Sequence, residues 1–509
     1  MKKIKNFKAA RIFVLFIAFC FMLPLLLSCG GDDNNTDTGG AEAETLPQNE
    51  NIQENADEPV LRENVPDNLP VDLDFGGAQI RILHRTENWA FWHDEIWVEE
   101  EIGEIVNDAI FRRNRGVEQR LNVEISSTAV PGDWSNMNNF LRTVRTSVGA
   151  GSDDYDFIAG HAWYMPLLAP EGLMYNLKNV PHLDPEAAWW SADCAEQMTI
   201  DGKLYYITGD YSQSLLRGMN VTFFNKQLAQ DFDIGNLYRI VLDGGFTIDK
   251  LGELIIGTYN DLNGDGVSNN EDMFGYATPT GNAMNAWVAA FDQPIVRKDS
   301  GGVPQLVLNS PLMIQMVETM YDFLYENNNV FVTPESSQGQ VFDMFAANRT
   351  VFMASILNAN DSLRAMESDY GILPMPKRNS EQPGYYTVAT DWHSMFCIPV
   401  TNTKIEAAGA VMEAMAAESY RRVTPAYYEV ALKQKYSRDE ETSQMLDIIR
   451  DGLRFDFGTV NTANLDGVNA VFRQLMDTRS RDFVSLYERS EAGYQQALDT
   501  LIESYRELP

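Results

Sequence analysis

Positive charge is scarce in this chain of 509 residues, in which 39 lysines and arginines stand against 73 aspartates and glutamates. The formal net charge of −34 repels phosphate backbones and anionic membrane leaflets, so we expect no nucleic-acid partner. Only four cysteines are present, too few for a disulfide scaffold. The remaining composition, 44% hydrophobic and 22% charged, is that of a globular protein long enough for two or more domains.

The common catalytic signatures are also missing. No His-Glu-x-x-His, Gly-x-Ser-x-Gly, Gly-x-Gly-x-x-Gly or phosphate-cradling loop occurs in the sequence. The five histidines, at positions 84, 93, 161, 182 and 393, have no metal-ligand spacing. Carboxylates are so numerous that some pair will always resemble a glycosidase dyad by chance. The sequence therefore predicts a protein that is not an enzyme.

One long hydrophobic run is present, and it lies at the N-terminus. Five positive residues within the first eleven positions precede the nearly unbroken apolar stretch Ile12–Leu27, which is typical of a signal peptide over 1–28. The run ends in Leu26-Leu27-Ser28-Cys29-Gly30, which resembles the lipobox of bacterial lipoproteins. The resemblance implies cleavage before Cys29 and acylation of its thiol. The alternative is a plain signal peptide with a chance cysteine.

Residues 29–70 contain few aromatic or aliphatic side chains and many Asp, Glu, Asn, Gln and Pro residues. Such a segment cannot bury enough apolar surface to fold, so we expect an acidic tether after the lipidated cysteine. A flexible chain of about 40 residues reaches roughly 35 Å. Together these features predict a protein that is lipid-anchored to the cell membrane on its extracytoplasmic face.

The body of the chain begins with alternating strand and helix patterns. Gln79–Leu83, Asn122–Ser126 and Tyr155–Ala159 have strand character, and Glu104–Leu121 and Trp134–Val148 are amphipathic. Strands and helices joined in this order by short links predict an α/β fold with a parallel, doubly wound sheet. Ligands of such sheets bind beyond the carboxyl ends of the strands.

Two segments rich in aromatic residues occupy that position, His84–Trp92 after the first strand and Gly160–Tyr164 after the third. Core packing gives no reason for aromatic residues on loops, whereas flat aromatic faces stack on the C–H faces of sugar rings. The alternative is that these side chains pack beneath the loops. The ligand-binding candidates in the two segments are His84, Trp89, Trp92, His161, Trp163 and Tyr164.

An acidic loop at 261–272 carries oxygen-bearing side chains at alternating positions. Its metal-ligand candidates are Asp261, Asn263, Asp265, Asn269 and Asp272, with Val267 offering a backbone carbonyl. Gly266 stands where a calcium loop turns sharply, and a ring of oxygens suits a hard cation. An EF-hand has Glu at the position of Asp272, so the loop is closer to the shorter-armed dockerin-like type, and Glu271 competes for that place. We expect a structural Ca²⁺ here rather than a solvated acidic turn.

Several segments together resemble the extracellular solute-binding proteins of bacterial ABC importers, the family 1 group that includes maltose-binding-protein-like sugar receptors. The matching segments are Val98–Ala109, Tyr155–Leu173, Asp201–Asp210, Phe223–Lys226, Phe246–Leu251 and Tyr370–Lys377. The resemblance covers nearly everything after residue 75. It implies two α/β lobes joined by crossing strands, with the solute held in the cleft between them.

The resemblance also implies boundaries and cleft residues. Lobe 1 would comprise 71–218 and about 391–430, and lobe 2 would comprise 219–390 and about 431–509. The crossings would run through 208–224 and near 385–392, and the long loop at 84–102 departs from the compact sugar-binding pattern. The cleft residues implied in this way are Asp210, Tyr211, Ser355, Asn358, Asp391 and Trp392.

We therefore expect a monomeric receptor that captures a carbohydrate, in particular an oligosaccharide, and delivers it to the transmembrane subunits of an ABC permease. Two alternatives stay open: a secreted carbohydrate-active enzyme, and a partner that presents its ligand to a membrane sensor kinase. Cys194 and Cys397 are the thiols left in the body of the chain, and they either pair or remain free.

Overall fold

The computed structural model describes residues 61–88, 92–363, 365–433 and 440–508. The signal peptide, the lipobox cysteine Cys29 and nearly all of the tether lie outside these described residues. None of the helices in the described ranges is both long and apolar enough to span a bilayer.

Strands and helices alternate along the described chain, and helices follow the last strand. The strands are β1 Ala78–Thr86, β2 Val123–Pro131, β3 Phe157–His161, β4 Asn220–Asn225, β5 Phe274–Pro279, β6 Val296–Lys298, β7 Pro304–Leu306, β8 Val330–Thr333, β9 Thr350–Ile356, β10 Tyr370–Leu373 and β11 Ser394–Cys397. The α-helices are α1 Ile105–Leu121, α2 Met137–Gly149, α3 Ala192–Met198, α4 Gln213–Arg217, α5 Lys226–Asp231, α6 Leu237–Leu242, α7 Ile248–Leu254, α8 Asn285–Ala290, α9 Pro311–Tyr321, α10 Gly339–Ala346, α11 Ala359–Leu363, α12 Ile405–Glu418, α13 Thr424–Lys433, α14 Glu440–Asp451, α15 Phe457–Val460, α16 Ala470–Asp477, α17 Phe483–Glu488 and α18 Glu491–Glu507.

The first sheet has the strand order β2-β1-β3-β11, and the part of the chain around it is here named lobe 1. β1 pairs in parallel with β2 and with β3, which confirms the predicted parallel arrangement of these strands. Ile80 and Ile82 of β1 are fully buried, as their alternation with polar residues predicts. Glu104 caps α1 by accepting from the backbone N–H of Asn107, and the helix ends at Asn122, whose φ of 49° reverses the chain direction.

The second sheet has the order β10-β4-β9-β5-β8 and forms lobe 2. Both sheets are mixed rather than purely parallel, because β11 runs antiparallel to β3, and β4 runs antiparallel to β9 and β10. β4 and β11 are the strands that directly follow the two passages of the chain between the lobes. The chain therefore runs through β4 and β11 in the direction opposite to that of the strands beside them.

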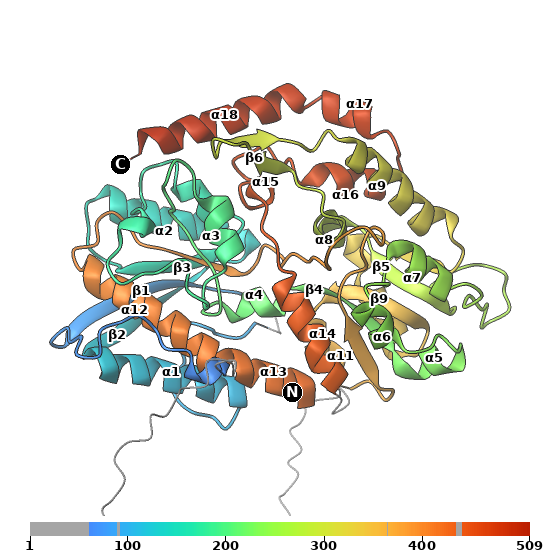
Figure 1. Ribbon diagram of the computed structural model, residues 1–509, viewed down its shortest axis with the longest axis horizontal. Helices are drawn as coiled ribbons and strands as arrows, with labels where there is room; N and C mark the ends of the chain where they lie inside the picture. The colour runs from blue at the N-terminus through green and yellow to red at the C-terminus, as the bar shows by residue number, and fades with distance from the viewer. Residues whose placement is uncertain (1–60, 89–91, 364, 434–439, 509) are drawn as a thin grey trace, which may run out of the picture. The chain divides into compact units, whose positions relative to one another are not determined.

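The two crossing segments lie side by side between the lobes, next to α4 and β4 (Figure 1). The backbone N–H of Asn220 donates to the carbonyl of Val388 at 3.1 Å, and that of Thr390 donates to the carbonyl of Gly218 at 2.9 Å. A Cβ at Gly218 would lie 2.8 Å from the Thr390 hydroxyl and 3.0 Å from the Ser214 carbonyl. Glycine therefore allows the two crossings to approach this closely.

A buried carboxylate joins the long loop before α1 to both crossings. Glu95 accepts from the Ser214 backbone N–H at 2.5 Å, from the Ser214 hydroxyl at 2.8 Å and from the Ser394 hydroxyl. Ser214 belongs to the first crossing, and Ser394 follows the second. The backbone carbonyl of Glu95 accepts from Arg113 of α1 at 2.9 Å. The loop that departs from the compact sugar-binding pattern is thus built into the hinge.

The C-terminal helices contact both lobes. α12 and α13 pack against α1 of lobe 1, and α14 packs against β10 and α6 of lobe 2. α18 contacts β7, and its Tyr505 hydroxyl lies 3.1 Å from the Tyr206 hydroxyl of lobe 1. Lys203 donates to the carbonyl of Tyr505 at 3.0 Å, a favourable place for a cation because it is the C-terminal end of a helix. Figure 1 shows α18 above lobe 1 and α17 above lobe 2, on the side away from α13.

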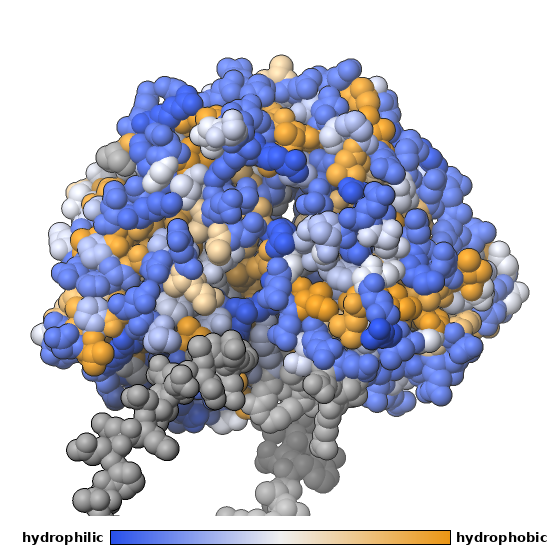
Figure 2. Space-filling view, in the orientation of Figure 1, coloured by the Kyte–Doolittle hydropathy of each residue, from blue (hydrophilic) through white to orange (hydrophobic). Residues whose placement is uncertain are grey.

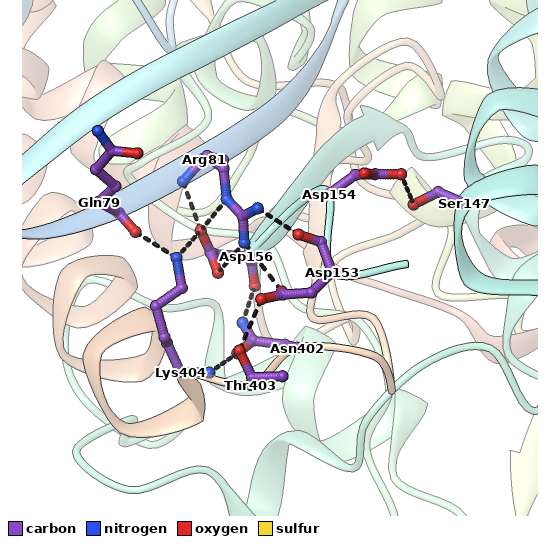
Figure 3. A network of polar contacts seen from close by, with 9 residues as sticks. All are labelled: Gln79, Arg81, Ser147, Asp153, Asp154, Asp156, Asn402, Thr403 and Lys404. Carbon is purple, nitrogen blue, oxygen red and sulfur yellow. Dashed lines mark hydrogen bonds and ion pairs between the residues drawn. The ribbon is translucent and has the colours of Figure 1, made fainter. Parts of the chain in front are cut away.

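A second buried carboxylate holds the returning chain to lobe 1 (Figure 3). Asp156 is 0% exposed and accepts from the Arg81 Nε at 3.1 Å and the Lys404 Nζ at 3.0 Å. Its backbone carbonyl accepts from the Asn402 side chain at 2.6 Å. The network links β1, the start of β3 and the segment before α12. It lies near the amino ends of these strands, opposite the edge at which such sheets bind ligands.

The two cysteines of the body do not pair. Cys194 and Cys397 are both buried free thiols. Burial raises the pKa of Cys194 to about 12, so its thiol stays protonated and unreactive at neutral pH. The disulfide alternative is therefore wrong, and both side chains act as small core residues.

Candidate functional site

A cleft lies between the two lobes beside the crossings. Its described lining comes from the loops after β3 and β5, from the second crossing and from the chain around α15. We call it the hinge cleft and define it by Trp163, Asn285, Thr390, Asp391, His393 and Phe455. Figure 2 shows the surface hollowed between the lobes, beneath the β6–β7 hairpin. The cleft holds about 60 Å³ and adjoins a cavity of about 340 Å³ with which it shares Asn285 and Phe455.

Three residues of the cleft lining carry buried polar atoms without a partner. The Asn285 Oδ1, Thr390 Oγ1 and His393 Nε2 atoms are buried and have no hydrogen-bond partner within the described part of the chain. His393 Nδ1 lies 2.8 Å from the carbonyl of Thr390 and must donate its proton there, which leaves a lone pair on Nε2. Burial lowers the pKa of His393 to about 4, so the imidazole is neutral at physiological pH. The hydrogen-bonding capacity of these three atoms is therefore unused within the described part of the chain.

The charge inside the hinge cleft is negative. Among the described residues no lysine or arginine lines it, whereas Asp391 and Asp456 do. Asp456 accepts from three backbone N–H groups, of which that of Thr459 is nearest at 2.8 Å, so its carboxylate has a structural role. Asp391 is open to the cleft, but the protein packed around it displaces water and raises its pKa to about 6. A cleft with this lining disfavours an anionic ligand.

Aromatic rings complete the cleft. Trp163 is half-buried, and its backbone N–H donates to His161 Nδ1 at 3.1 Å. His161 is buried and stacked on Tyr164 with ring centroids 5.4 Å apart, so it orients the loop that carries Trp163. Phe455 packs beside His393 on the other side. Apolar ring faces combined with polar acceptors match the two kinds of surface that a sugar ring presents.

Several of the predicted cleft residues are buried at the junction of lobe 1 with the hinge instead. The Tyr164 hydroxyl donates to the carbonyl of Gly132 at 3.0 Å. Tyr211 is 0% exposed and stacks on Phe396 with ring centroids 4.5 Å apart. Asp210 accepts from the Thr424 hydroxyl at 2.7 Å and pairs with Arg450 at 3.1 Å. These three side chains are occupied by contacts within the protein, and the structure does not place them in the hinge cleft.

A second group of predicted residues gathers around Arg85. The Arg85 guanidinium lies 4.5 Å from the Trp92 ring centroid and donates to the carbonyl of Trp392. His84 Nδ1 lies 3.6 Å from Asp94, and burial lowers the pKa of His84 to about 4. Trp92 lines a separate cavity of about 390 Å³, whose described lining includes none of the residues of the hinge cleft. Trp89 lies outside the described residues.

Ser355 and Asn358 lie at the carboxyl end of β9. Ser355 pairs with Val221 of β4, and the backbone N–H of Asn358 donates to the carbonyl of Arg217 at 2.8 Å. Asn358 Oδ1 is buried without a hydrogen-bond partner among the described residues. Both residues are therefore beside the first crossing, as predicted, but they do not line the hinge cleft.

The acidic loop is held by hydrogen bonds from its side chains to its own backbone. Asp261 accepts from the N–H of Gly264 at 2.7 Å and of Gly266 at 2.9 Å, and both glycines have a φ of 72°. The buried Asp272 accepts from the N–H of Asn269 at 3.1 Å. In the described ranges no three His, Cys, Asp or Glu side chains form a cluster that could hold a metal ion. The calcium site therefore stays a prediction. Its ion would need the amide oxygens of the asparagines and a backbone carbonyl as ligands in addition to carboxylates.

Asn282, Asn285, Thr390, His393 and Phe455 line the hinge cleft although the sequence interpretation did not select them. Asn282 and Asn285 follow β5, so the rule that ligands bind at strand ends, applied to the second sheet, would have found them. His393 directly follows the predicted second crossing. Phe455 lies in the link between α14 and α15, far along the chain, and no local pattern distinguishes it.

The low pKa of His393 makes protein stability depend on pH. The unfolded imidazole titrates near 6.5, so as pH falls the unfolded chain gains a proton that the folded state does not. As the pH falls below the ordinary histidine pKa of 6.5, His393 therefore destabilises the folded state increasingly. Relative to a His393→Asn variant, the wild type should lose about 2 kcal/mol of unfolding free energy between about pH 7 and about pH 5, measured by urea denaturation. If the difference in unfolding free energy between wild type and His393→Asn were the same at both pH values, His393 would not be held neutral in the folded protein.

No protein-family model matches the chain, and no curated protein matches its sequence. Solved structures match its fold. The cyclic α-maltosyl-1,6-maltose binding protein from Arthrobacter globiformis superposes with a TM-score of 0.54 at 15% identity, over 84% of this chain and 100% of that one. A cyclo/maltodextrin-binding protein complexed with maltotetraose gives 0.52 at 11% identity, over 85% and 97% of the two chains.

The GacH receptor of Streptomyces glaucescens, known unliganded and in complex with acarbose, gives a TM-score of 0.51 at 11% identity, over 85% of this chain and 100% of that one. These likenesses extend over both sheets and the helices around them. They confirm the predicted fold: the chain has the two α/β lobes of the solute-binding-protein type, as in maltose-binding-protein-like sugar receptors.

Proposed function

We propose that this chain is an extracytoplasmic solute-binding protein that holds an uncharged carbohydrate in the hinge cleft and delivers it to an ABC permease. The observation that carries the proposal is the lining of the cleft. Asn285, Thr390 and His393 line it together with Trp163 and Phe455 and carry buried polar atoms without a partner, and the described lining contains no lysine or arginine. Hydroxyl donors and apolar ring faces of a neutral sugar complement such a surface.

The arrangement of the cleft also suits a receptor that closes on its ligand. Trp163 belongs to lobe 1, Asn285 to lobe 2, and Thr390 to the crossing between them. A ligand that contacts all three stabilises the conformation in which the lobes lie close together. The closed conformation exposes a different surface from the open one, so a permease can distinguish the two. The proteins of similar fold are described as carbohydrate-binding proteins and receptors, which supports the same function.

Removal of the Trp163 ring tests the assignment of the cleft. Trp163→Ala should weaken carbohydrate binding by about 1–3 kcal/mol, because a stacking face is lost, with little change in melting temperature. Calorimetry against a panel of plant and host glycans measures the affinity. Tyr175→Ala, which truncates a half-buried aromatic residue of lobe 1 outside the cleft lining, serves as the control. The receptor function would be contradicted if no glycan of the panel produced binding heat with the wild type, or if the protein cleaved a bound glycan into products.

The proposal includes a lipid anchor at Cys29, and the lipobox-like sequence before it is the support. Acylation would hold the chain at the membrane, and the acidic segment that follows would give the body freedom to reach a permease. The wild type should incorporate a labelled fatty acid during growth of the cells, and replacement of the thiol, Cys29→Ser, should abolish the incorporation, detected on gels of the purified protein. Equal labelling of wild type and Cys29→Ser, or no labelling of the wild type, would rule out this anchor.

The proposal also includes a structural Ca²⁺ in the loop at 261–272, held by Asp261, Asn263, Asp265, Asn269, Asp272 and the Val267 carbonyl. A chelator should lower the melting temperature of the wild type by about a few degrees, because an ion bound only to the folded state stabilises it. Asp265→Ala should melt lower from the start and show no further change with chelator. Equal chelator responses in both proteins would exclude calcium binding at this loop.

A further inference from the structure

A largely exposed tryptophan stands at the edge of lobe 1. Trp134 is 64% exposed and begins the short 3₁₀ turn Trp134–Asn136, three residues after the end of β2. In a parallel sheet this is the edge at which ligands bind. The sequence pattern placed Trp134 at the start of the amphipathic stretch 134–148, yet its side chain is largely exposed. An exposed tryptophan at the ligand-binding edge of the sheet is a candidate for a contact with the ligand.

Trp134 continues the hinge cleft outwards. Its ring centroid lies 4.4 Å from that of Trp163, and the two planes make an angle of 61°. Trp163 lines the hinge cleft, so the pair, which we call the tryptophan rim, leads from the cleft onto the edge of lobe 1. An edge-on contact of this kind leaves most of one ring face of Trp134 uncovered, in agreement with its exposure.

The turn that carries Trp134 is fixed firmly to lobe 1. The Asp133 carboxylate accepts from the backbone N–H groups of Ser135 at 2.8 Å and Asn136 at 3.2 Å. The N–H of Gly132 donates to the carbonyl of Thr86 at 2.9 Å, and a Cβ at Gly132 would lie 2.6 Å from the Cβ of Arg85. The ring is thus presented by a rigid backbone, which lowers the ordering cost of binding.

The surroundings of Trp134 do not resemble a protein-docking patch. Its exposed neighbours along the chain are Pro131 and the polar residues Ser135, Asn138 and Asn139. Protein interfaces are built on contiguous apolar patches, and a single aromatic ring among amides and hydroxyls does not form one. A sugar ring, in contrast, stacks one face on an aromatic ring and hydrogen-bonds to polar groups around it.

We infer that Trp134 forms an additional carbohydrate subsite, on which an outer ring of an oligosaccharide stacks while another part of the same molecule occupies the hinge cleft. The inference rests on the proposed function and extends it to the length of the ligand. The hinge cleft holds about 60 Å³ and the adjoining cavity about 340 Å³, against roughly 300–1,000 Å³ for ordinary ligand pockets, so the outer units of a long oligosaccharide must lie beyond these two spaces. The tryptophan rim provides one path for these outer units.

The test compares chain lengths. Wild type, Trp134→Ala and Trp134→Phe are titrated with linear oligosaccharides of increasing length from the malto-, cello-, xylo- and manno- series. For the series that binds, Trp134→Ala should weaken the longest member about tenfold and leave the shortest bound member unchanged, and Trp134→Phe should restore most of the loss. Ile256→Ala, which truncates a 73% exposed apolar side chain of lobe 2, is the matched control and should leave all affinities unchanged.

The possible failures are distinguishable. Equal affinities of Trp134→Ala and wild type at every length, or an equal loss at every length, would overturn the subsite while leaving the receptor function in place. If no saccharide of any length binds the wild type, the proposed function fails, and the subsite fails with it. Because Trp134 is exposed, both variants should keep the wild-type melting temperature, which verifies that the affinities refer to folded protein.

Discussion

The structure depends on the burial of one carboxylate, that of Glu95, at the place where the two lobes meet. A buried charge is tolerated only when donors surround it, and Glu95 accepts from the backbone and hydroxyl of Ser214 and from the hydroxyl of Ser394. These donors belong to different passages of the chain between the lobes. The need to satisfy one carboxylate thus brings together the loop before α1, the first crossing and the strand that follows the second.

The position of the hinge cleft follows from this junction. With the crossings held side by side, Thr390 and His393 are placed between the carboxyl ends of β3 and β5. The hydrogen bond between His393 and the Thr390 carbonyl then orients the free nitrogen of the imidazole. Trp163 approaches from lobe 1 on a loop that His161 orients. The cleft is therefore an outcome of how the chain returns between the lobes, and its lining, which among the described residues contains no lysine or arginine, favours a neutral ligand.

Part of this site could be predicted from the sequence. Alternation of apolar residues located β1, a short apolar run located β3, and the rule for strand ends then selected Trp163, while the resemblance to solute-binding proteins selected Asp391. The same reasoning selected Tyr164 and Tyr211, which the structure places in contacts within the protein. On a sequence these aromatic residues look alike. Their burial is decided by Gly132 and Phe396, which are distant along the chain.

By itself the sequence determined the alternation of strands and helices at the start of the body, its α/β class and its excess of negative charge, and the resemblance to solute-binding proteins implied the two lobes. The first three properties depend on local periodicity and composition, which neighbouring residues specify. Only the tertiary structure decided which side chains face the cleft, that Phe455 of the C-terminal segment joins Trp163 there, and that the two thiols stay apart. Such choices depend on which distant segments satisfy each other's hydrogen bonds and fill each other's volume, and no local pattern encodes that pairing.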